Sequence, residues 1–297
     1  MSRTLTLALP DGRSLEAVDE GDEHGTLLVF HHGSPGAAVP FEPFDRAATE
    51  RGIRLVTLSR AGFGDSSRHE GRSVADAAAD AAALADHLGT ERFLTMGWSG
   101  GGPHALACAA LLPERVSAAA TIAGVAPYDA DDLVWTDGMG ESNQIEYPLA
   151  ARDPDELLRW MQPQVEALAV VEPDDIVSEL RTLISEVDEA EVTGAVGELL
   201  AASFRRAFAN GVWGWYDDDL AFVRPWGFEL ASIRVPVSVW QGRQDLMVPF
   251  AHGEWLVAHV PTVRARLRPE HGHLSLAVGA IGEILDDLLE AAASAGP

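Results

Sequence analysis

The sequence of 297 residues predicts an α/β fold, in which helices flank a mostly parallel β-sheet. Two observations support this prediction. In residues 1–125, short apolar runs alternate with longer helical stretches rich in alanine, and the alternation resumes in residues 231–297. Residues 126–230 are acidic and interrupted by prolines, and they show helical spacing without a convincing strand pattern. We therefore predict a core of residues 1–125 and 231–297 with an inserted helical cap of residues 126–230.

The predicted strands of the core show two patterns. Residues 4–9 alternate polar and apolar side chains, and the turn at residues 10–12 predicts a hairpin with residues 14–18. Residues 27–30 are continuously apolar, as in a strand that is covered on both faces. Further strands are predicted at residues 53–58, 92–96, 116–122, 235–240 and 264–268.

Helical stretches lie between these strands and provide the crossover connections that a parallel sheet needs. In the cap, residues 156–161 and 179–187 also have helical spacing. In the core, helices are predicted at residues 44–51, 74–88, 102–112, 249–260 and 281–289.

The composition excludes several classes of function. The 46 acidic residues exceed the 21 basic ones and give a formal net charge of −25, so the surface repels nucleic acids. No lysine is present, which excludes a Schiff-base lysine and a phosphate-binding P-loop lysine. The single cysteine, Cys108, excludes an internal disulfide and a cysteine-based zinc cluster, and its Ala-rich surroundings predict a buried thiol.

Neither a signal peptide nor an apolar run of about 20 residues is recognisable in the sequence. We therefore expect a cytoplasmic protein that acts on a small-molecule substrate without a cofactor or a metal. Nucleic-acid and membrane partners are not expected, and a homodimer stays open.

Residues 97–101, with the sequence GWSGG, match the pattern G-x-S-x-G. The match alone is weak, because glycine and serine are frequent in this chain. Its setting strengthens it, since a predicted strand precedes the motif and a predicted helix follows it, as a nucleophile elbow requires. The tight turn leaves no room for side chains two positions before and after the serine, which explains Gly97 and Gly101. The pattern predicts that Ser99 is a catalytic nucleophile.

A serine nucleophile needs a base, and the base needs an acid that orients it. Asp245 follows a predicted strand, at the edge where open α/β sheets place their sites, and Asp129 is its rival. The loop after the last predicted strand carries His271 and His273. We favour His273 as the base, because glycine precedes it and apolar residues follow it. The two histidines could in principle chelate a metal, but no cysteine or acidic cluster accompanies them by spacing.

The tetrahedral intermediate of acyl transfer carries an oxyanion that needs backbone donors. The N–H of Gly100, directly after the nucleophile, should be the first donor. The second should come from the loop after the strand at residues 27–30, most simply from the N–H of Ser34, because Pro35 has no N–H.

With these motifs in order along the chain, the sequence resembles the α/β-hydrolase superfamily, and within it a capped serine hydrolase. The resemblance implies an eight-stranded, mostly parallel sheet flanked by helices, with a helical cap after the sixth strand. It also implies a catalytic triad of Ser99 as nucleophile, His273 as base and Asp245 as its orienter. It rests on the segments HGSPG (32–36), SRAGFGDSS (59–67), GWSGGGP (97–103), GRQDLMVP (242–249) and HGHLSL (271–276).

The resemblance implies a carboxylesterase-like serine hydrolase that cleaves a carboxylic ester through an acyl-enzyme. An aminopeptidase, a C–C bond hydrolase and a perhydrolase on the same triad are alternatives, and a small-molecule receptor or signalling module is the alternative of another class. Haloalkane dehalogenases and epoxide hydrolases of this fold have Asp where Ser99 stands, which disfavours both activities. HGSPG and GWSGGG match the HGGPG and GGSWGS of proline iminopeptidases only in part, which disfavours that peptidase activity.

The cap should form the roof of the substrate pocket, and aromatic side chains should supply apolar walls. The expected lining residues are Trp98, Trp213, Trp215 and Trp226, and Trp135 and Trp160 add to the aromatic content. The adjacent Asp217, Asp218 and Asp219 could capture a substrate amine, but a solvated helix cap or turn is the favoured interpretation.

Overall fold

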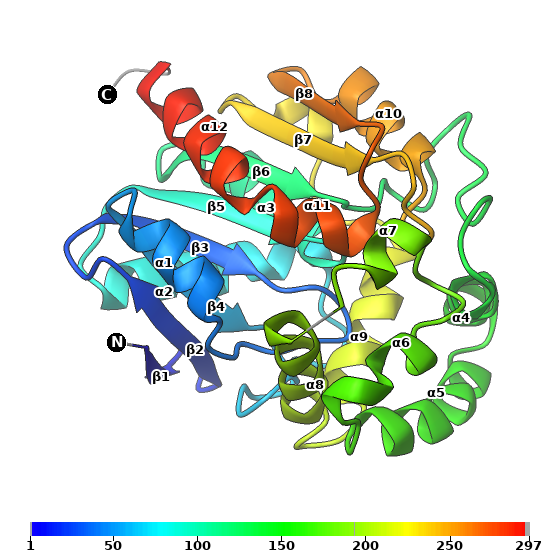
Figure 1. Ribbon diagram of the computed structural model, residues 1–297. Helices are drawn as coiled ribbons and strands as arrows, with labels where there is room; N and C mark the ends of the chain where they lie inside the picture. Colours follow the sequence, from blue (N-terminus) through cyan, green and yellow to red (C-terminus); the bar gives the residue numbers. More distant parts are fainter. Residues whose placement is uncertain (1, 193, 295–297) are drawn as a thin grey trace.

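A computed structural model describes residues 2–192 and 194–294, and in these ranges eight strands form a single sheet (Figure 1). The strand order is β1-β2-β4-β3-β5-β6-β7-β8. Only β2 runs antiparallel to its neighbours, and the other pairs are parallel, so the predicted fold class is confirmed. The strands are β1 (Arg3–Ala8), β2 (Ser14–Gly21), β3 (Thr26–His31), β4 (Ile53–Ser59), β5 (Phe93–Trp98), β6 (Val116–Ile122), β7 (Val237–Gly242) and β8 (Val263–Arg268).

The strand patterns explain where each strand lies in the sheet. In the amino-terminal hairpin, Leu5 stands opposite Ala17 and Leu7 opposite Leu15, and the exposed residues of β1 alternate with less exposed ones at the sheet edge. The apolar strands β3 and β5 lie in the middle of the sheet, where helices cover both faces and almost every side chain is buried.

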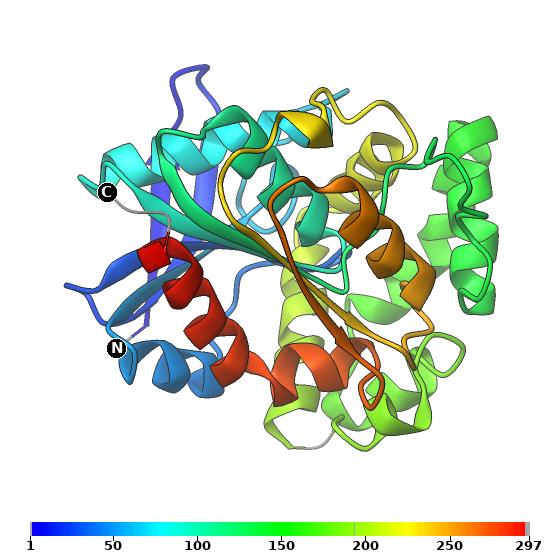
Figure 2. The same ribbon diagram turned by 90° about the horizontal axis from the view of Figure 1, so that it is seen from above.

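Helices cover the sheet on both sides, as the view in Figure 2 shows. On one face lie α1 (Glu42–Thr49), α11 (His273–Gly279) and α12 (Ile281–Ser294), and their buried side chains form one apolar cluster with the strands. On the other face lie α2 (Ala77–His87), α3 (Gly101–Leu111) and α10 (Phe250–His259), which share a second cluster. Short 3-10 helices are labelled η1 (Val74–Asp76), η2 (Pro173–Asp175) and η3 (Leu230–Ser232).

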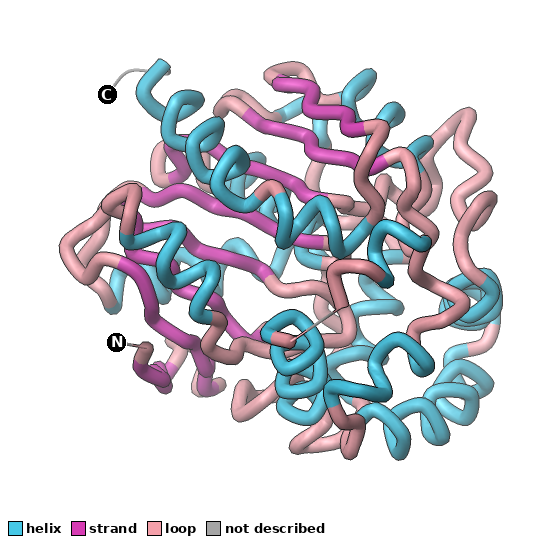
Figure 3. The backbone as a smooth tube through the Cα atoms, viewed as in Figure 1, coloured by secondary structure: helices cyan, strands magenta, loops and turns pink. Residues whose placement is uncertain are grey.

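A helical insertion joins β6 to β7 and lies beyond the carboxyl ends of the parallel strands (Figures 1 and 3). It consists of α4 (Glu141–Arg152), α5 (Pro154–Leu168), α6 (Ile176–Glu179), α7 (Glu186–Glu189), α8 (Ala195–Ala207) and α9 (Trp213–Phe222), and residues 126–192 and 194–230 contain no strand. Its inner side chains form a third apolar cluster that includes Leu157, Met161 and Trp215. Among the described residues, no helix has the length and apolar character needed to cross a membrane.

The single helix expected over residues 179–187 is wrong. Helix α6 ends at Glu179, a turn follows, and α7 begins only at Glu186. The turn packs against the start of α4, where the Thr182 hydroxyl lies 3.1 Å from the Ser142 hydroxyl and a side chain on Gly140 would collide with the Thr182 carbonyl. This tertiary contact overrides the local helical spacing.

Candidate active site

Ser99 lies in the sharp turn between β5 and α3, with the positive φ of 54° that is rare outside glycine. Its backbone N–H donates to the Ile122 carbonyl at 2.8 Å, which fixes the turn to the next strand. A Cβ on Gly97 would lie 2.0 Å from the Gly101 carbonyl oxygen, and a Cβ on Gly101 would lie 2.0 Å from the His31 carbonyl oxygen. The two glycines are therefore required by backbone contacts, one of them with the end of β3.

Asp245 and His273 meet at the carboxyl ends of β7 and β8, and both side chains are buried. The His273 Nδ1 lies 2.8 Å from the Asp245 Oδ2. The other oxygen of Asp245 accepts hydrogen bonds from the backbone N–H groups of Met247 and Val248, each at 2.8 Å. Asp245 is thus a fixed acceptor that orients the imidazole through its Nδ1.

The environment of His273 favours its protonated form. Burial opposes the charged imidazolium, but the nearby Asp245 carboxylate, the hydrogen bond to it and the charge of Asp188 outweigh burial, so the pKa of His273 is raised. Its ring also packs against the Trp98 indole, with 5.4 Å between ring centroids.

The structure separates the rival residues from this arrangement. Asp129 is exposed in a turn after β6 and does not contact His273 in the described part of the chain. The ring of His271 is partly exposed and lies 3.9 Å from the carboxylate of its neighbour Glu270. Of the two candidate acids and the two candidate bases, the structure brings Asp245 and His273 together.

Ser34 and Gly100 lie against each other at the candidate oxyanion site. A Cβ on Gly100 would stand 2.8 Å from the Ser34 Cβ. Within residues 2–192 and 194–294, neither backbone N–H donates to a protein acceptor. Both amides are therefore free to donate to an oxygen of a bound substrate.

Arg60, at the end of β4, holds the backbone that carries the Ser34 amide. The Gly33 carbonyl accepts a hydrogen bond from the Arg60 guanidinium at 3.2 Å and one from the His32 Nδ1 at 2.6 Å. In a planar trans peptide the carbonyl and the following N–H point in opposite directions. Anchoring the Gly33 carbonyl therefore turns the Ser34 N–H away from Arg60.

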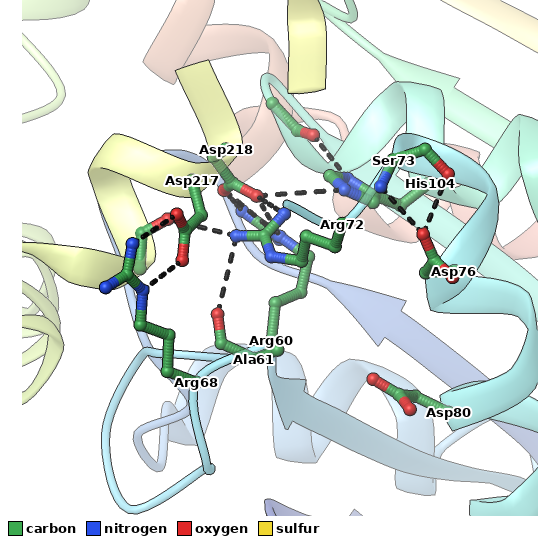
Figure 4. Close-up of polar contacts among 12 residues, drawn as sticks. Arg60, Ala61, Arg68, Arg72, Ser73, Asp76, Asp80, His104, Asp217 and Asp218 are labelled. Atoms are coloured by element: carbon green, nitrogen blue, oxygen red, sulfur yellow. Dashed lines mark hydrogen bonds and ion pairs between the residues drawn. The ribbon is translucent and has the colours of Figure 1, made fainter. Parts of the chain in front are cut away.

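The charge of Arg60 is balanced by Asp218 of α9, with 2.6 Å between the guanidinium and the carboxylate (Figure 4). Arg72 approaches the same carboxylate at 2.6 Å. Burial opposes the ionised form of Asp218, but the two arginines hold its pKa well below the usual range. Through Arg60, this buried ion-pair network joins the insertion to residues 32–36 at the candidate oxyanion site, a segment that we call the oxyanion loop.

The favoured interpretation of the three aspartates as a solvated helix cap is wrong. Asp217, Asp218 and Asp219 lie inside α9 and are all buried. Asp217 pairs with Arg68 at 2.8 Å, as Figure 4 shows, and none of the three lines the cavity at Ser99. Capture of a substrate amine by these residues is therefore also not supported. The arginine partners of Asp217 and Asp218 lie about 150 positions away in the chain, beyond the reach of local sequence patterns.

Asp188 of α7 is a residue that sequence analysis missed. Its fully buried carboxylate accepts hydrogen bonds from the backbone N–H groups of His273, Leu274 and Ser275, each at 2.9 Å. A Cβ on Gly272 would lie 2.3 Å from one of its oxygens, so this position requires glycine. An acid of the insertion thus caps the helix whose first residue is His273.

A cavity of about 1100 Å³, partly open to solvent, lies between the core and the insertion. Ser99 and His273 line it from the core. The insertion contributes several leucines together with polar and aromatic residues, among them Ser142, Asn143, Glu146, Tyr147, Trp160, Gln164 and Trp215.

The four expected pocket tryptophans divide into two pairs. Trp98 and Trp215 line the cavity. Trp213 is partly exposed and lies under the Arg68 guanidinium, 4.0 Å from it, and Trp226 is buried in the apolar cluster below α3. Trp213 and Trp226 therefore do not belong to the pocket, because Trp213 packs under Arg68 at the surface and Trp226 packs in the core.

Glu146 places a buried carboxyl group in the cavity wall. The Trp215 indole N–H donates to it at 2.6 Å. Burial raises the pKa of Glu146 and, together with the charge of Glu146, holds the pKa of neighbouring Asp219 well above its usual range. The two acids together therefore carry less charge than two free carboxylates.

The model of the family described as "alpha/beta hydrolase fold" matches residues 26–280. The chain belongs to this family. Among curated relatives of this alpha/beta hydrolase, "Uncharacterized hydrolase YcgS" of Bacillus subtilis is 35% identical over 118 residues, and "Non-heme chloroperoxidase" of Streptomyces lividans is 32% identical over 136 residues. The chain spans 40% and 49% of their lengths, and the matches cover 39% and 45% of the chain.

"Proline iminopeptidase" of Neisseria meningitidis serogroup B is 25% identical, and the match covers 91% of both chains. Two solved structures show the same fold. An esterase from Thermogutta terrifontis is 20% identical with a TM-score of 0.69, covering 98% of this chain and 99% of the other. An enol-lactonase from Burkholderia xenovorans is 19% identical with a TM-score of 0.69, covering 96% and 100%.

Proposed function

We propose that the protein is a serine hydrolase that cleaves a carboxylic ester. One observation carries the proposal. Ser99, in the strained turn at the start of α3, faces the same cavity as His273, whose other ring nitrogen is bonded to Asp245. A hydroxyl, an imidazole and a carboxylate in this order are the parts of an activated nucleophile.

In the first half of the proposed reaction, the Ser99 Oγ attacks the ester carbonyl carbon, and its proton passes to the Nε2 of His273. The oxyanion accepts hydrogen bonds from the N–H groups of Ser34 and Gly100. The intermediate then expels the alcohol, which takes the proton from His273, and an acyl ester on Ser99 remains.

In the second half, water attacks the acyl ester and gives a proton to His273. The intermediate collapses, the carboxylic acid leaves, and the proton returns to the Ser99 oxygen. We also propose that residues 126–230 act as the cap over this reaction, because their helices line the cavity. Asp188 holds the end of the loop of residues 269–273, which we call the histidine loop, and Asp218 holds the oxyanion loop through Arg60.

Turnover of a panel of esters and amides by the wild type and Ser99→Ala tests this proposal. We expect wild-type hydrolysis of activated esters and a loss of nearly all activity in Ser99→Ala. Tight binding of small molecules with hardly any turnover would instead indicate a receptor that keeps the fold. Activity that survives in Ser99→Ala would refute Ser99 as the nucleophile.

An aminopeptidase is the second candidate, favoured by Glu146. A buried carboxyl among aromatic rings offers a hydrogen-bond acceptor and a π-face to an ammonium group, and a bound ammonium would favour the ionised form of the carboxyl. The long match to a protein named proline iminopeptidase agrees with this candidate.

Paired substrates distinguish the two candidates. An aminopeptidase should cleave amino-acid p-nitroanilides with a free amine at least tenfold faster than their N-acetyl forms, and Glu146→Gln should abolish that difference. The matched comparison for Glu146→Gln is Gln164→Glu, which adds a carboxylate to the same cavity wall instead of removing one. Equal rates for free and acetylated substrates would exclude amine recognition at Glu146.

A further inference from the structure

A second cavity lies between the sheet and helix α8 of the insertion, and its empty space of about 740 Å³ includes solvent at its open mouth. Its floor is formed by Phe30 of β3, Leu55 of β4 and Ile122 of β6. Its roof is one face of α8, where residues spaced by three and four positions point the same way: Val196, Leu199, Leu200 and Ser203. The remaining walls include the loop of residues 37–41 and the helices α1 and α11, which lie on this face of the sheet in Figure 1.

The two cavities adjoin at the reacting groups. Five residues line both of them, namely His32, Trp98, Leu200, Ser203 and Leu274. Trp98 directly precedes Ser99, and Leu274 directly follows His273. The apolar cavity therefore begins beside the bond that the proposed reaction would break.

The polar side chains of Ser203, His32 and Glu20 in the wall of the second cavity already have partners. The Trp98 indole N–H, which stands where the two cavities adjoin, has no partner among the described residues. The Ser203 hydroxyl is bonded to the Ala37 backbone, and both ring nitrogens of His32 are engaged with the Gly33 carbonyl and the Arg60 N–H. Glu20 accepts from the Phe41 N–H at 3.1 Å. A charged or strongly polar ligand group would lose its hydration here and gain little in return, whereas an alkyl chain would bury its surface favourably.

We propose that this cavity holds the acyl chain of the substrate and that the ester substrate carries an alkyl acyl group of several carbons. The inference rests on the proposed function and adds the substrate class. The loop that supplies His32 and Ala37 to this cavity also carries Ser34, so an acyl carbonyl at the oxyanion site has its chain beside the apolar opening. The more polar cavity under α4 and α5 then remains for the alcohol.

The test is a series of p-nitrophenyl esters from acetate to decanoate, in which only the acyl chain varies. We expect kcat/KM to rise about two- to fourfold with each added methylene until the cavity is filled, because each buried methylene contributes a nearly constant amount. A parallel series of alkyl acetates varies only the alcohol chain. It should show a weaker dependence on length.

Leu199→Trp narrows the cavity from the roof, where this side chain lines only the second cavity. We expect the ratio of kcat/KM for octanoate to that for acetate to fall at least tenfold. Leu111→Trp makes the same exchange at an exposed leucine of α3 and should keep the wild-type ratio. Val196→Phe, on the same face of α8, gives a second variant should Leu199→Trp fail to fold.

A flat acyl series, an unchanged ratio in the folded Leu199→Trp variant, or a dependence on alcohol length alone would overturn the acyl pocket. Rates of labelling by fluorophosphonates with one- and eight-carbon chains give the same comparison if turnover is slow. Hydrolysis of acetate with a flat series refutes only the acyl pocket. Absence of turnover for every ester, with Ser99 unlabelled, refutes the proposed function as well.

Discussion

At the residue scale, the two oxygens of the Asp245 carboxylate have different partners. Oδ2 meets the His273 ring, and Oδ1 is held by two backbone N–H groups. In Asp245→Asn an amide replaces this acceptor, and the imidazole turns to the wrong tautomer. We expect kcat to fall by about 10⁴, as measured by ester hydrolysis at neutral pH. Asp129→Asn, at an exposed position, should leave kcat within twofold, and a reversed order would move the acid to the loop after β6.

Asp188 acts on His273 through the backbone and through its charge. The carboxylates that face His273 are Asp245, from the loop after β7, and Asp188, from α7. The base works as neutral imidazole, so kcat/KM should rise with pH through the pKa of His273, which lies above its ordinary value. Removing the negative charge in Asp188→Asn lowers this pKa, and the rise should shift to lower pH.

The matched control for Asp188 is Glu189→Gln, which removes a charge from an exposed position of the same helix. We expect its pH profile to coincide with that of the wild type. Asp188→Ala should also lower kcat by about 10- to 100-fold, because the histidine loop loses its anchor. A lower kcat with an unshifted pH profile would mean that Asp188 only maintains the fold.

At the scale of elements, the turn between β5 and α3 depends on close backbone contacts. A methyl group on Gly101 would overlap the His31 carbonyl oxygen. Neither β3 nor α3 can move easily to relieve this overlap, because both are packed in the core. We expect Gly101→Ala to lower the free energy of unfolding by about 3 kcal/mol or more, or to prevent folding. Gly279→Ala, with its nearest neighbour at 3.8 Å, should change it by less than about 1 kcal/mol in urea denaturation. Equal stability of the two variants would contradict the crowded turn.

The same elements show what local pattern can and cannot predict. The strands, the elbow and the order of Ser99, Asp245 and His273 follow from periodicity and motif spacing, because each depends on residues close together in the chain. The turn at residues 180–185 does not, because its packing partner is α4. Asp188 carries no local signal, since the amides that it caps belong to residues 273–275. Gly272 beside His273 is the one sequence feature that fits this contact.

At the scale of the whole molecule, the burial of Glu20 makes stability depend on pH. Burial raises its pKa from 4.5 to about 7. Between these values the folded state binds a proton that the unfolded chain has released, so the free energy of unfolding falls as pH rises. We expect Glu20→Gln to lose this part of the decline between pH 5 and 8 in urea denaturation. Glu70→Gln, at an exposed position, should keep it, and identical slopes for all three proteins would contradict the assignment.

The long-range contacts also explain why the insertion and the core should work as one unit. Asp188 and Asp218 come from helices between β6 and β7, yet they hold the histidine loop and the oxyanion loop. Composition and spacing do not pair these aspartates with partners that lie 85 and 158 positions away. The pairing appears only once the sheet has brought both loops to the same edge.

The central claim, that Ser99 is the activated nucleophile of a triad, is tested most directly by covalent labelling with a fluorophosphonate followed by peptide mapping. We expect one adduct, on Ser99. In Ser99→Ala we expect no adduct and a fall in kcat of about 10⁶. An adduct on another serine, or full hydrolytic activity in Ser99→Ala, would contradict the claim.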